Sequence, residues 1–261
     1  MNSDEITVEI AELAGFFAAD GSMQKEHLCF WGNPKSDKDY YDRYLPKLFS
    51  KAFGISINPH EKPSNSVYGF YICNKKIIEF FNKKLGFPIG KKTYSVEIPD
   101  IIYRDKNLVR AFIRGFFAGD GCLNFDKRYS QDQKILRVIH TYPRIQIKCV
   151  SKNLIYQMSN FLNNLEIINF ISKKQSRKRN EAESYMLQVS GKIMLDRWVD
   201  EIGLSNDNHR TRYEIFKKHG FVPSNTTYKE RLKILEGKLN PWSFYPKWAC
   251  SLAWIGRQGK S

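Results

Sequence analysis

A nine-residue pattern of small and aromatic residues occurs twice in the chain. Residues 13–21 read LAGFFAADG, and residues 113–121 read IRGFFAGDG. Small residues recur at helical spacing in each copy, which predicts a helix with a flat stripe along one side. Because Gly in a helix interior costs about 1 kcal/mol relative to Ala, Gly15 and Gly115 indicate close approach of two backbones. The duplication therefore predicts two similar halves that meet at these helices.

The segments that follow the two motifs repeat one order of elements, in which each motif helix is followed by two strands, a helix, two strands and a helix. In the first half we expect a strand-like stretch, a helix, two strands and a helix at 22–33, 38–53, 55–60, 67–73 and 74–86. In the second half the corresponding segments are 121–128, 135–149, 152–165, 167–173, 184–190 and 192–203. The expected organisation is an N-terminal half at 1–104, a C-terminal half at 105–212, and a basic, Trp-rich extension of unassigned function at 213–261.

Each motif ends in Asp-Gly, at Asp20-Gly21 and at Asp120-Gly121. A glycine after a helix predicts the left-handed C′ conformation, which places both aspartates in a last helical turn. A carboxylate there faces the negative end of the helix dipole, and two of them on paired helices repel each other. Mg²⁺, which binds through one or two carboxylates plus water and phosphate oxygens, would relieve both costs. A single Asp-Gly is typical of a turn, whereas the duplication favours a metal site.

The charge balance narrows the class of partner. Lys and Arg number 42 against 27 Asp and Glu, a net charge of +15, and nucleic acid is the polyanion that such an excess attracts. The five cysteines form no C-x-x-C pair and the histidines no H-E-x-x-H pair, which argues against a disulfide framework and a zinc site. The sequence has no long apolar run and no signal-peptide pattern, so we expect an intracellular protein with no membrane segment, in the cytoplasm or in an organelle that encodes it.

The two motifs resemble those of the LAGLIDADG homing endonucleases, in the form where one chain carries both. The resemblance covers about residues 5–212. It implies an α+β fold of two pseudo-symmetric αββαββα halves, each with a saddle-shaped antiparallel sheet, joined at a two-helix interface. It also implies a monomer that makes a Mg²⁺-dependent double-strand break in a long DNA target at an intron-insertion site and leaves 3′ overhangs. Mn²⁺ or Ca²⁺ is expected to replace Mg²⁺ in binding.

The resemblance also nominates site residues. The family places a basic residue before a segment that ends in Ile-Pro, and GKKTYSVEIP at 90–99 nominates Lys92, with Lys91 in reserve. In the second half IGLSNDNHRT at 202–211 nominates Arg210, which has the charge of Lys without its proton chemistry. The implied catalytic residues are Asp20, Asp120, Lys92 and Arg210, and the implied metal-binding positions are Asp20, Asp120, Ala19 and Gly119.

Polar and apolar side chains alternate most clearly in YPRIQIKCV at 142–150, which places Arg144, Gln146 and Lys148 on one face of a strand. Arg and Lys suit guanine edges in the major groove and Gln suits adenine, although a solvated sheet face would show the same alternation. Less regular alternation adds Ser22, Gln24, Lys25, Arg137 and His140 to the expected DNA contacts. The run at 173–179 adds Lys173, Lys174 and Arg177, either as phosphate contacts or as an exposed charged loop.

Two other functions fit the same features. A basic surface serves RNA as well as DNA, so the main alternative is a maturase that binds intron RNA and assists splicing of its host intron. The second is a DNA-binding regulator that has lost cleavage, and the presence of both motif aspartates argues against it. The chain begins with Met1 and lacks the terminal residues of an intein, which favours a free-standing protein encoded within an intron.

Overall fold

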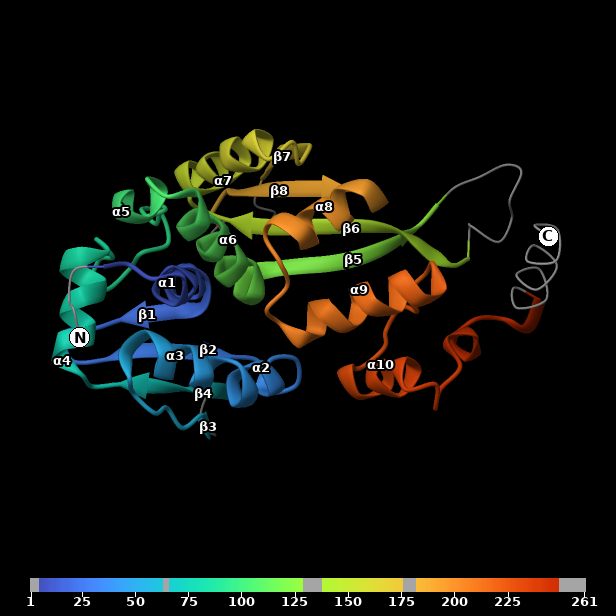
Figure 1. The fold of residues 1–261 in the computed structure, drawn as a ribbon, viewed down its shortest axis with the longest axis horizontal. Helices are drawn as coiled ribbons and strands as arrows, with labels where there is room; N and C mark the ends of the chain where they lie inside the picture. The colour runs from blue at the N-terminus through green and yellow to red at the C-terminus, as the bar shows by residue number, and fades with distance from the viewer. Residues whose placement is uncertain (1–4, 63–65, 129–137, 176–181, 249–261) are drawn as a thin grey trace.

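The computed structural model describes residues 5–62, 66–128, 138–175 and 182–248, and two helices form its centre (Figure 1). These are α1 (Val8–Asp20) and α6 (Lys106–Asp120). The N-terminal half continues with β1 (Gly21–Met23), β2 (Leu28–Gly32), α2 (Lys38–Arg43), α3 (Leu45–Phe53), β3 (His60–Lys62), β4 (Val67–Ile72), α4 (Lys75–Glu79) and the π-helical turn η2 (Phe80–Lys84). The C-terminal half continues with β5 (Gly121–Lys127), β6 (His140–Cys149), α7 (Lys152–Asn164), β7 (Asn169–Lys174), β8 (Ser184–Ser190) and α8 (Lys192–Glu201).

Each half carries one four-stranded antiparallel sheet, and the two sheets share one strand order. The order is β1-β2-β4-β3 in the first sheet and β5-β6-β8-β7 in the second. Equivalent core pairs, Phe30 opposite Phe70 and Ile147 opposite Leu187, fix the register of the central strands. Because a shift by one residue would turn these side chains to the outer face, the apolar pattern determines the register. The expected α+β fold of two repeated halves is confirmed.

The small-residue stripes lie in the interface between α1 and α6. A Cβ atom added at Gly15 would lie 1.9 Å from the carbonyl oxygen of Phe112, and one added at Gly115 would lie 1.9 Å from the carbonyl oxygen of Glu12. Both distances are far below van der Waals contact, so only glycine fits at either position. The predicted close approach of the two backbones is confirmed, and it is nearly symmetric.

An ion pair crosses the same interface without a symmetric counterpart. Glu12 of α1 is 1% exposed, and it accepts hydrogen bonds from Arg114 of α6 at 2.7 Å and from the Tyr44 hydroxyl at 2.8 Å. The equivalent positions in the repeats are Phe112 and Ala14. The pair therefore distinguishes the correct association of the two different halves from an association of two like halves.

The glycines that end the motif helices do not adopt the left-handed conformation predicted for them. Gly21 has φ −76° and ψ 156°, and Gly121 has φ −86° and ψ 158°, because a strand starts at each without an intervening turn. Glycine is required for a steric reason instead. An added Cβ would lie 2.2 Å from the Phe17 ring at Gly21 and 2.1 Å from the Phe117 ring at Gly121.

Other element boundaries depart from the sequence expectations in small ways. The helix expected at 38–53 is divided into α2 and α3, with Pro46 at the start of α3, because proline suits a first helical turn and disrupts a helix interior. The strand expected near 55–60 lies at His60–Lys62. No helix in the described parts of the chain is both long and apolar enough to span a bilayer.

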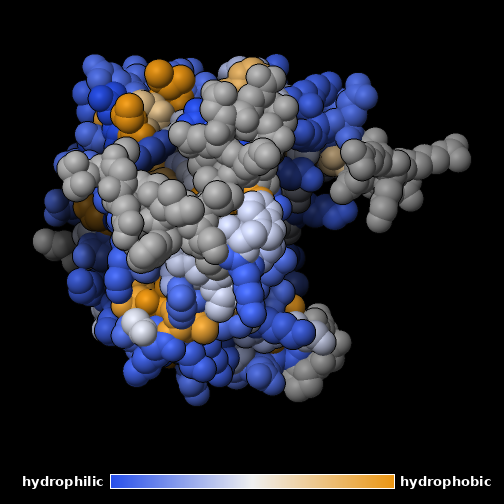
Figure 2. Space-filling model, turned by 90° about the vertical axis from the view of Figure 1, so that its right-hand side faces the viewer, coloured by the Kyte–Doolittle hydropathy of each residue, from blue (hydrophilic) through white to orange (hydrophobic). Residues whose placement is uncertain are grey.

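The C-terminal extension packs along the second sheet. It begins inside α9 (Asp207–His219) and continues through α10 (Tyr228–Leu235) and the 3₁₀ turn η4 (Pro241–Phe244). Tyr245 contacts the start of β6, where its hydroxyl lies 3.0 Å from Nδ1 of His140. Figure 2 shows that the described surface on this side of the molecule is mostly hydrophilic, with small apolar patches.

Candidate active site

The two motif aspartates each lie against the end of the opposite helix. The carboxylate of Asp20 approaches Gly119 of α6, since a Cβ added at Gly119 would lie 3.0 Å from Oδ2 of Asp20. Asp120 lines a cavity of about 270 Å³ together with Ala18 and Ala19 of α1. The close contact of the helices therefore creates two centres. We call them the Asp20 centre, at the carboxyl end of α6, and the Asp120 centre, at the carboxyl end of α1.

Both carboxyl groups are harder to ionise than a solvated aspartate. Burial, followed by the charges of Asp120 and Asp37, raises the pKa of Asp20 to about 7. Burial also raises the pKa of Asp120, and the charge of Lys92 opposes that shift. Each raised pKa means that the surroundings destabilise the ionised carboxylate. A bound cation stabilises such a carboxylate more than it stabilises a solvated one.

Lys92 lies where the resemblance placed it. Its ammonium donates hydrogen bonds to the carbonyl oxygens of Ala18 at 2.7 Å and of Ala19 at 3.2 Å, at the negative end of α1. Burial lowers the pKa of Lys92, while the charges of Asp120 and then Asp20 act in the opposite direction. Lys148 also lines the cavity of the Asp120 centre, whereas Lys91 is exposed.

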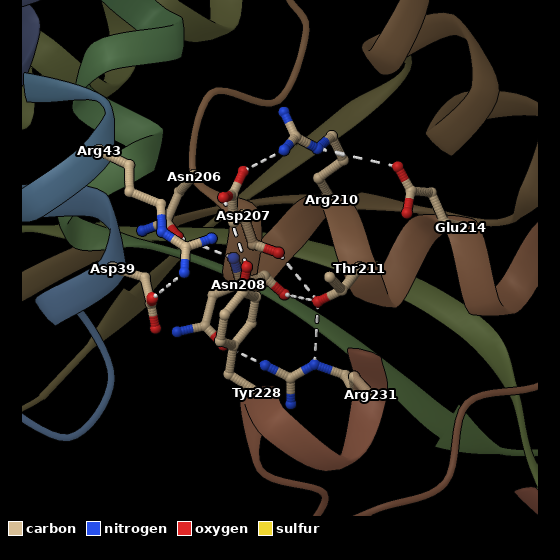
Figure 3. A network of polar contacts seen from close by, with 10 residues as sticks. All are labelled: Asp39, Arg43, Asn206, Asp207, Asn208, Arg210, Thr211, Glu214, Tyr228 and Arg231. Carbon is tan, nitrogen blue, oxygen red and sulfur yellow. Dashed lines mark hydrogen bonds and ion pairs between the residues drawn. The ribbon is translucent and has the colours of Figure 1, made fainter. Parts of the chain in front are cut away.

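Arg210 does not occupy the corresponding place in the second half. Its half-exposed side chain forms ion pairs along α9 with Asp207 and Glu214 (Figure 3). The side chain that reaches the end of α6 is Asn206, which is 4% exposed and donates to the carbonyl oxygen of Ala118 at 2.9 Å. Asn206 is also the N-cap of α9, so Arg210 begins the second turn and points elsewhere.

No spacing shared by the two halves identifies Asn206. Gly86 and Gly203 both have positive φ, 74° and 85°, and each follows the end of the last helix of its half. Lys92 stands six residues after Gly86, whereas Asn206 stands three residues after Gly203. The basic residue expected in the second centre is a neutral amide.

Two further residues at the Asp20 centre carried no sequence signal. Asp37 and Tyr41 approach Gly32 at the end of β2, where an added Cβ would lie 3.0 Å from Oδ2 of Asp37 and 3.2 Å from the Tyr41 hydroxyl. The charges of Asp20 and Asp37 add to burial in raising the pKa of Tyr41. The hydroxyl is buried and makes no hydrogen bond to any described residue. Only packing of α2 against the sheet brings these groups to Asp20.

The donor set suits a hard divalent cation that retains water. The described residues include no group of three or more His, Cys, Asp or Glu side chains able to hold a metal ion. Two desolvated carboxylates at helix carboxyl ends, close to main-chain carbonyls, are what Mg²⁺ takes from a protein when water and phosphate supply the other ligands. The residues present therefore fit the expected ion at this site.

The outer face of the second sheet carries the predicted row of polar side chains. Arg144, Gln146 and Lys148 alternate with buried Ile145 and Ile147 along β6. The guanidinium of Arg144 lies 2.6 Å from the carboxylate of its neighbour Asp126, and the Gln146 amide donates to Gln188 at 3.1 Å. The row is continuous with the Asp120 centre, because Lys148 belongs to both.

The remaining predicted contacts are dispersed. Ser22 is exposed on β1, and Gln24 and Lys25 are exposed in the turn that follows it. Lys173 pairs with Glu183 at 2.9 Å beside Lys174 at the end of β7, and His140 is turned toward Tyr245 of the extension. Arg137 and Arg177 lie outside the described residues.

The outer face of the first sheet has a different chemistry, which the sequence analysis did not identify. The ring of His60 lies 5.5 Å from that of Trp31 and 6.0 Å from that of Tyr71, and the ammonium of Lys62 lies 5.4 Å from the Trp31 ring centroid. Alternation in LCFWG at 28–32 was the available signal, because Phe30 faces the core and Trp31 does not. This face is aromatic, whereas the face of the second sheet is polar.

Comparison with known proteins agrees with this architecture. The sequence model of the LAGLIDADG-like domain matches residues 107–203. Among solved structures, variants of the homing endonuclease I-DmoI superpose with a TM-score of 0.50 at 17% identity, over 75% of this chain and 94% of theirs. The meganuclease I-SmaMI, solved with uncleavable DNA, gives a TM-score of 0.50 at 13% identity over 91% of this chain and 98% of its own.

Curated relatives match only through a small part of their length. The replication factor C small subunit of Methanocaldococcus jannaschii is 27% identical over 242 residues, and the probable translation initiation factor IF-2 of the same organism is 28% identical over 190 residues. This chain spans 12% of the first protein and 15% of the second.

The paired motif helices, the two repeated sheets and the crossed aspartates define the LAGLIDADG fold. Residues 107–203 match the LAGLIDADG-like domain, and the chain as a whole has the fold of the single-chain LAGLIDADG homing endonucleases.

Proposed function

We propose that this protein is a site-specific DNA endonuclease that acts as a monomer and makes a divalent-metal-dependent double-strand break. The observation that carries the proposal is the pair of desolvated carboxylates, Asp20 and Asp120, held at the ends of two packed helices between two open sheet faces. Neither carboxylate stabilises the free fold, because burial raises the pKa of both. Perturbed acids of this kind are characteristic of functional sites.

The chain supplies positioning and charge for hydrolysis. Asp20 and Asp120, with the backbone of Ala19 and Gly119, would hold Mg²⁺, which when bound lowers the pKa of water and stabilises a leaving oxygen. Lys92, fixed by two carbonyl oxygens, brings a positive charge to the phosphate that gains charge in the transition state. The cut strands would carry 3′ overhangs, as in the family that the motifs resemble.

The curated relatives do not support any activity that their names denote. They support the idea that the matched segment is a mobile genetic element. A clamp-loader subunit, a translation factor, an ATP synthase subunit and an aminotransferase are unrelated proteins, yet this chain matches 12–18% of each of these relatives. The matched segment is therefore what they have in common. We infer that the target of this protein is the insertion site of its own coding element, an intron in the simplest case.

Cleavage of a plasmid that carries the joined flanking sequence tests the proposal. With Mg²⁺ the protein is expected to linearise this plasmid and to leave a plasmid without the site intact, and EDTA is expected to abolish the reaction. Asp20→Asn and Asp120→Asn should each bind the site in Ca²⁺ without making the double-strand break. Full cleavage by both variants would refute the metal-site assignment.

A further inference from the structure

The strands of the first sheet carry few side chains that can read a base by hydrogen bonds. They read GSM, LCFWG, HEK and VYGFYI, with no Arg, Asn or Gln and with one lysine, Lys62. Arg, Asn and Gln are the residue types that pair through two hydrogen bonds with guanine or adenine edges. The ammonium of Lys62 lies 5.4 Å from the ring centroid of Trp31, so this lysine is held over an aromatic ring. The second sheet differs, because β6 alone contributes Arg144, Gln146 and Lys148.

Two rings of the first sheet meet above Gly69. Trp31 of β2 and His60 of β3 both pair with Gly69, from opposite sides of β4. Two strand spacings separate their backbones by roughly 9–10 Å, yet their ring centroids lie only 5.5 Å apart. Gly69 is buried although it belongs to the outer face of the sheet, because it has no side chain to hold the rings apart. The rings therefore form one apolar surface across three strands.

Tyr71 extends this surface toward the Asp20 centre. Its ring lies 6.0 Å from that of His60 and 5.9 Å from that of His27, and the residue is 52% exposed. Tyr71 is opposite Cys29 on β2, and β2 pairs with β1, which begins directly after Asp20. A contiguous exposed apolar surface of this kind marks an interaction site. Its place on the sheet that starts at the Asp20 centre favours the molecule on which that centre acts.

Resting on the proposed nuclease function, we infer that the first sheet recognises its half of the target through the 5-methyl groups of thymine. That methyl group is the apolar feature that distinguishes one base edge from the others in the major groove. An aromatic face without guanidinium or amide groups discriminates by this feature, whereas β6 reads hydrogen-bonding edges. Trp31 and Tyr71 are the specificity-determining residues, and the half-site under the first sheet is rich in thymine.

Duplexes in which deoxyuridine replaces thymine test the inference, because uracil pairs as thymine does and lacks only the methyl group. The joined flanking sequence is prepared with this replacement in one half-site at a time, and the affinity of the full chain is measured in Ca²⁺. Each lost methyl contact should weaken binding about fourfold, so two or more contacts should give a loss of about tenfold or more. The loss should occur in one half-site, with no comparable loss in the other.

Two variants connect the methyl effect to the first sheet. Trp31→Ala and Tyr71→Ala should each bind the thymine duplex more weakly and should lose most of the difference between the thymine and deoxyuridine duplexes. Tyr71 is the more exposed of the two, so Tyr71→Ala should fold even where Trp31→Ala does not, and it carries the same test. Tyr156→Ala is the matched control, since Tyr156 on α7 is 44% exposed and also lies beneath a lysine ammonium. It should leave both affinities unchanged.

5-Methylcytosine separates the methyl group from the rest of the base. Cytosine at the sensitive thymine positions should weaken binding, and 5-methylcytosine at the same positions should recover about fourfold in affinity per position. Equal affinity for the cytosine and 5-methylcytosine duplexes would mean that the first sheet does not read the methyl group, and it would overturn the inference.

The remaining outcomes separate this inference from the proposed function. Equal losses from deoxyuridine in both half-sites, or no loss in either, would overturn the inference while leaving specific binding and cleavage established. A loss in one half-site that persists in Trp31→Ala and Tyr71→Ala would place the methyl contacts outside the first sheet and would overturn it as well. Failure to bind or cut the joined flanking sequence in preference to unrelated DNA would contradict the nuclease function itself.

Discussion

Replacing Gly15 by alanine tests whether the close approach of α1 and α6 holds the protein together. Helix propensity alone predicts a gain of about 1 kcal/mol from Gly to Ala. The new methyl carbon would lie 1.9 Å from the carbonyl oxygen of Phe112, a separation that real Cβ atoms do not show. Relieving that contact requires the helices to move apart by roughly 1 Å over a close-packed interface. Overpacking of this kind costs about 1–3 kcal/mol, and here the neighbour is rigid backbone.

The net effect should be a loss of about 2 kcal/mol in the free energy of unfolding. For a chain of this size that loss lowers the melting temperature by roughly 4–8 °C. Gly115→Ala should behave alike, because its contact with the carbonyl oxygen of Glu12 has the same length. Lys51→Ala, on the exposed side of α3, is the control and should stay within about 0.5 kcal/mol of the wild type.

Thermal and urea unfolding measure the stability, and cleavage of the joined-flank plasmid measures function. A 1 Å displacement of the aspartates should lower the cleavage rate by about 100-fold at a temperature where the variant is folded. Stabilisation of Gly15→Ala by the amount that helix propensity predicts would refute the reasoning, since it would mean that the two backbones do not touch.

Three further predictions concern charge. The pKa of Asp20 is about 7 in the folded protein against 3.8 in the unfolded chain, so the free energy of unfolding without divalent cations should fall as the pH rises from about 4 to about 7. Urea unfolding at pH 5 and pH 8 measures this loss, and Asp20→Asn should remove much of it. Arg114→Met leaves the buried carboxylate of Glu12 without its cation and should lower the free energy of unfolding by about 3–5 kcal/mol. Adding Glu12→Leu should recover most of that loss, and equal losses in the single and double variants would contradict the ion-pair account. In selection from a randomised target site, Arg144→Ala should relax base choice at one position, and Asp126→Asn is the control. A uniform loss of affinity across all sequences would make Arg144 a phosphate contact.

Intron splicing with and without the protein remains the test of the maturase alternative. Acceleration of splicing by a cleavage-dead Asp20→Asn variant would establish a second activity on the same fold. No acceleration would leave DNA cleavage as the single proposed function.

Local patterns were sufficient for the architecture and for naming two candidate site residues. The stripes around Gly15 and Gly115 predicted the helix interface, because only a residue without a side chain permits that spacing. The alternation at 142–150 predicted the polar face of β6, since side chains on a strand alternate between its two faces. Asp20 and Asp120 were predicted as site residues because each ends a duplicated helix.

The surroundings of the two aspartates depended on tertiary structure. Lys92 lies 74 positions from the carbonyl that it contacts, and Asn206 lies 88 positions from its own. Contacts of that separation follow from the angle at which elements pack, which no local pattern encodes. Asn206 contacts the end of α6, whereas Arg210, four residues later, pairs with Asp207 and Glu214 along α9.

The sequence by itself determined that this protein has two halves and two acidic centres, because duplication and periodicity are local properties of a chain. Which charges stand beside each aspartate was decided only by the fold. Asp37 reaches the Asp20 centre because α2 packs over the end of β2. Electrostatic interaction depends on distance in space and on burial, so two nearly identical motifs acquired unequal surroundings when the chain folded.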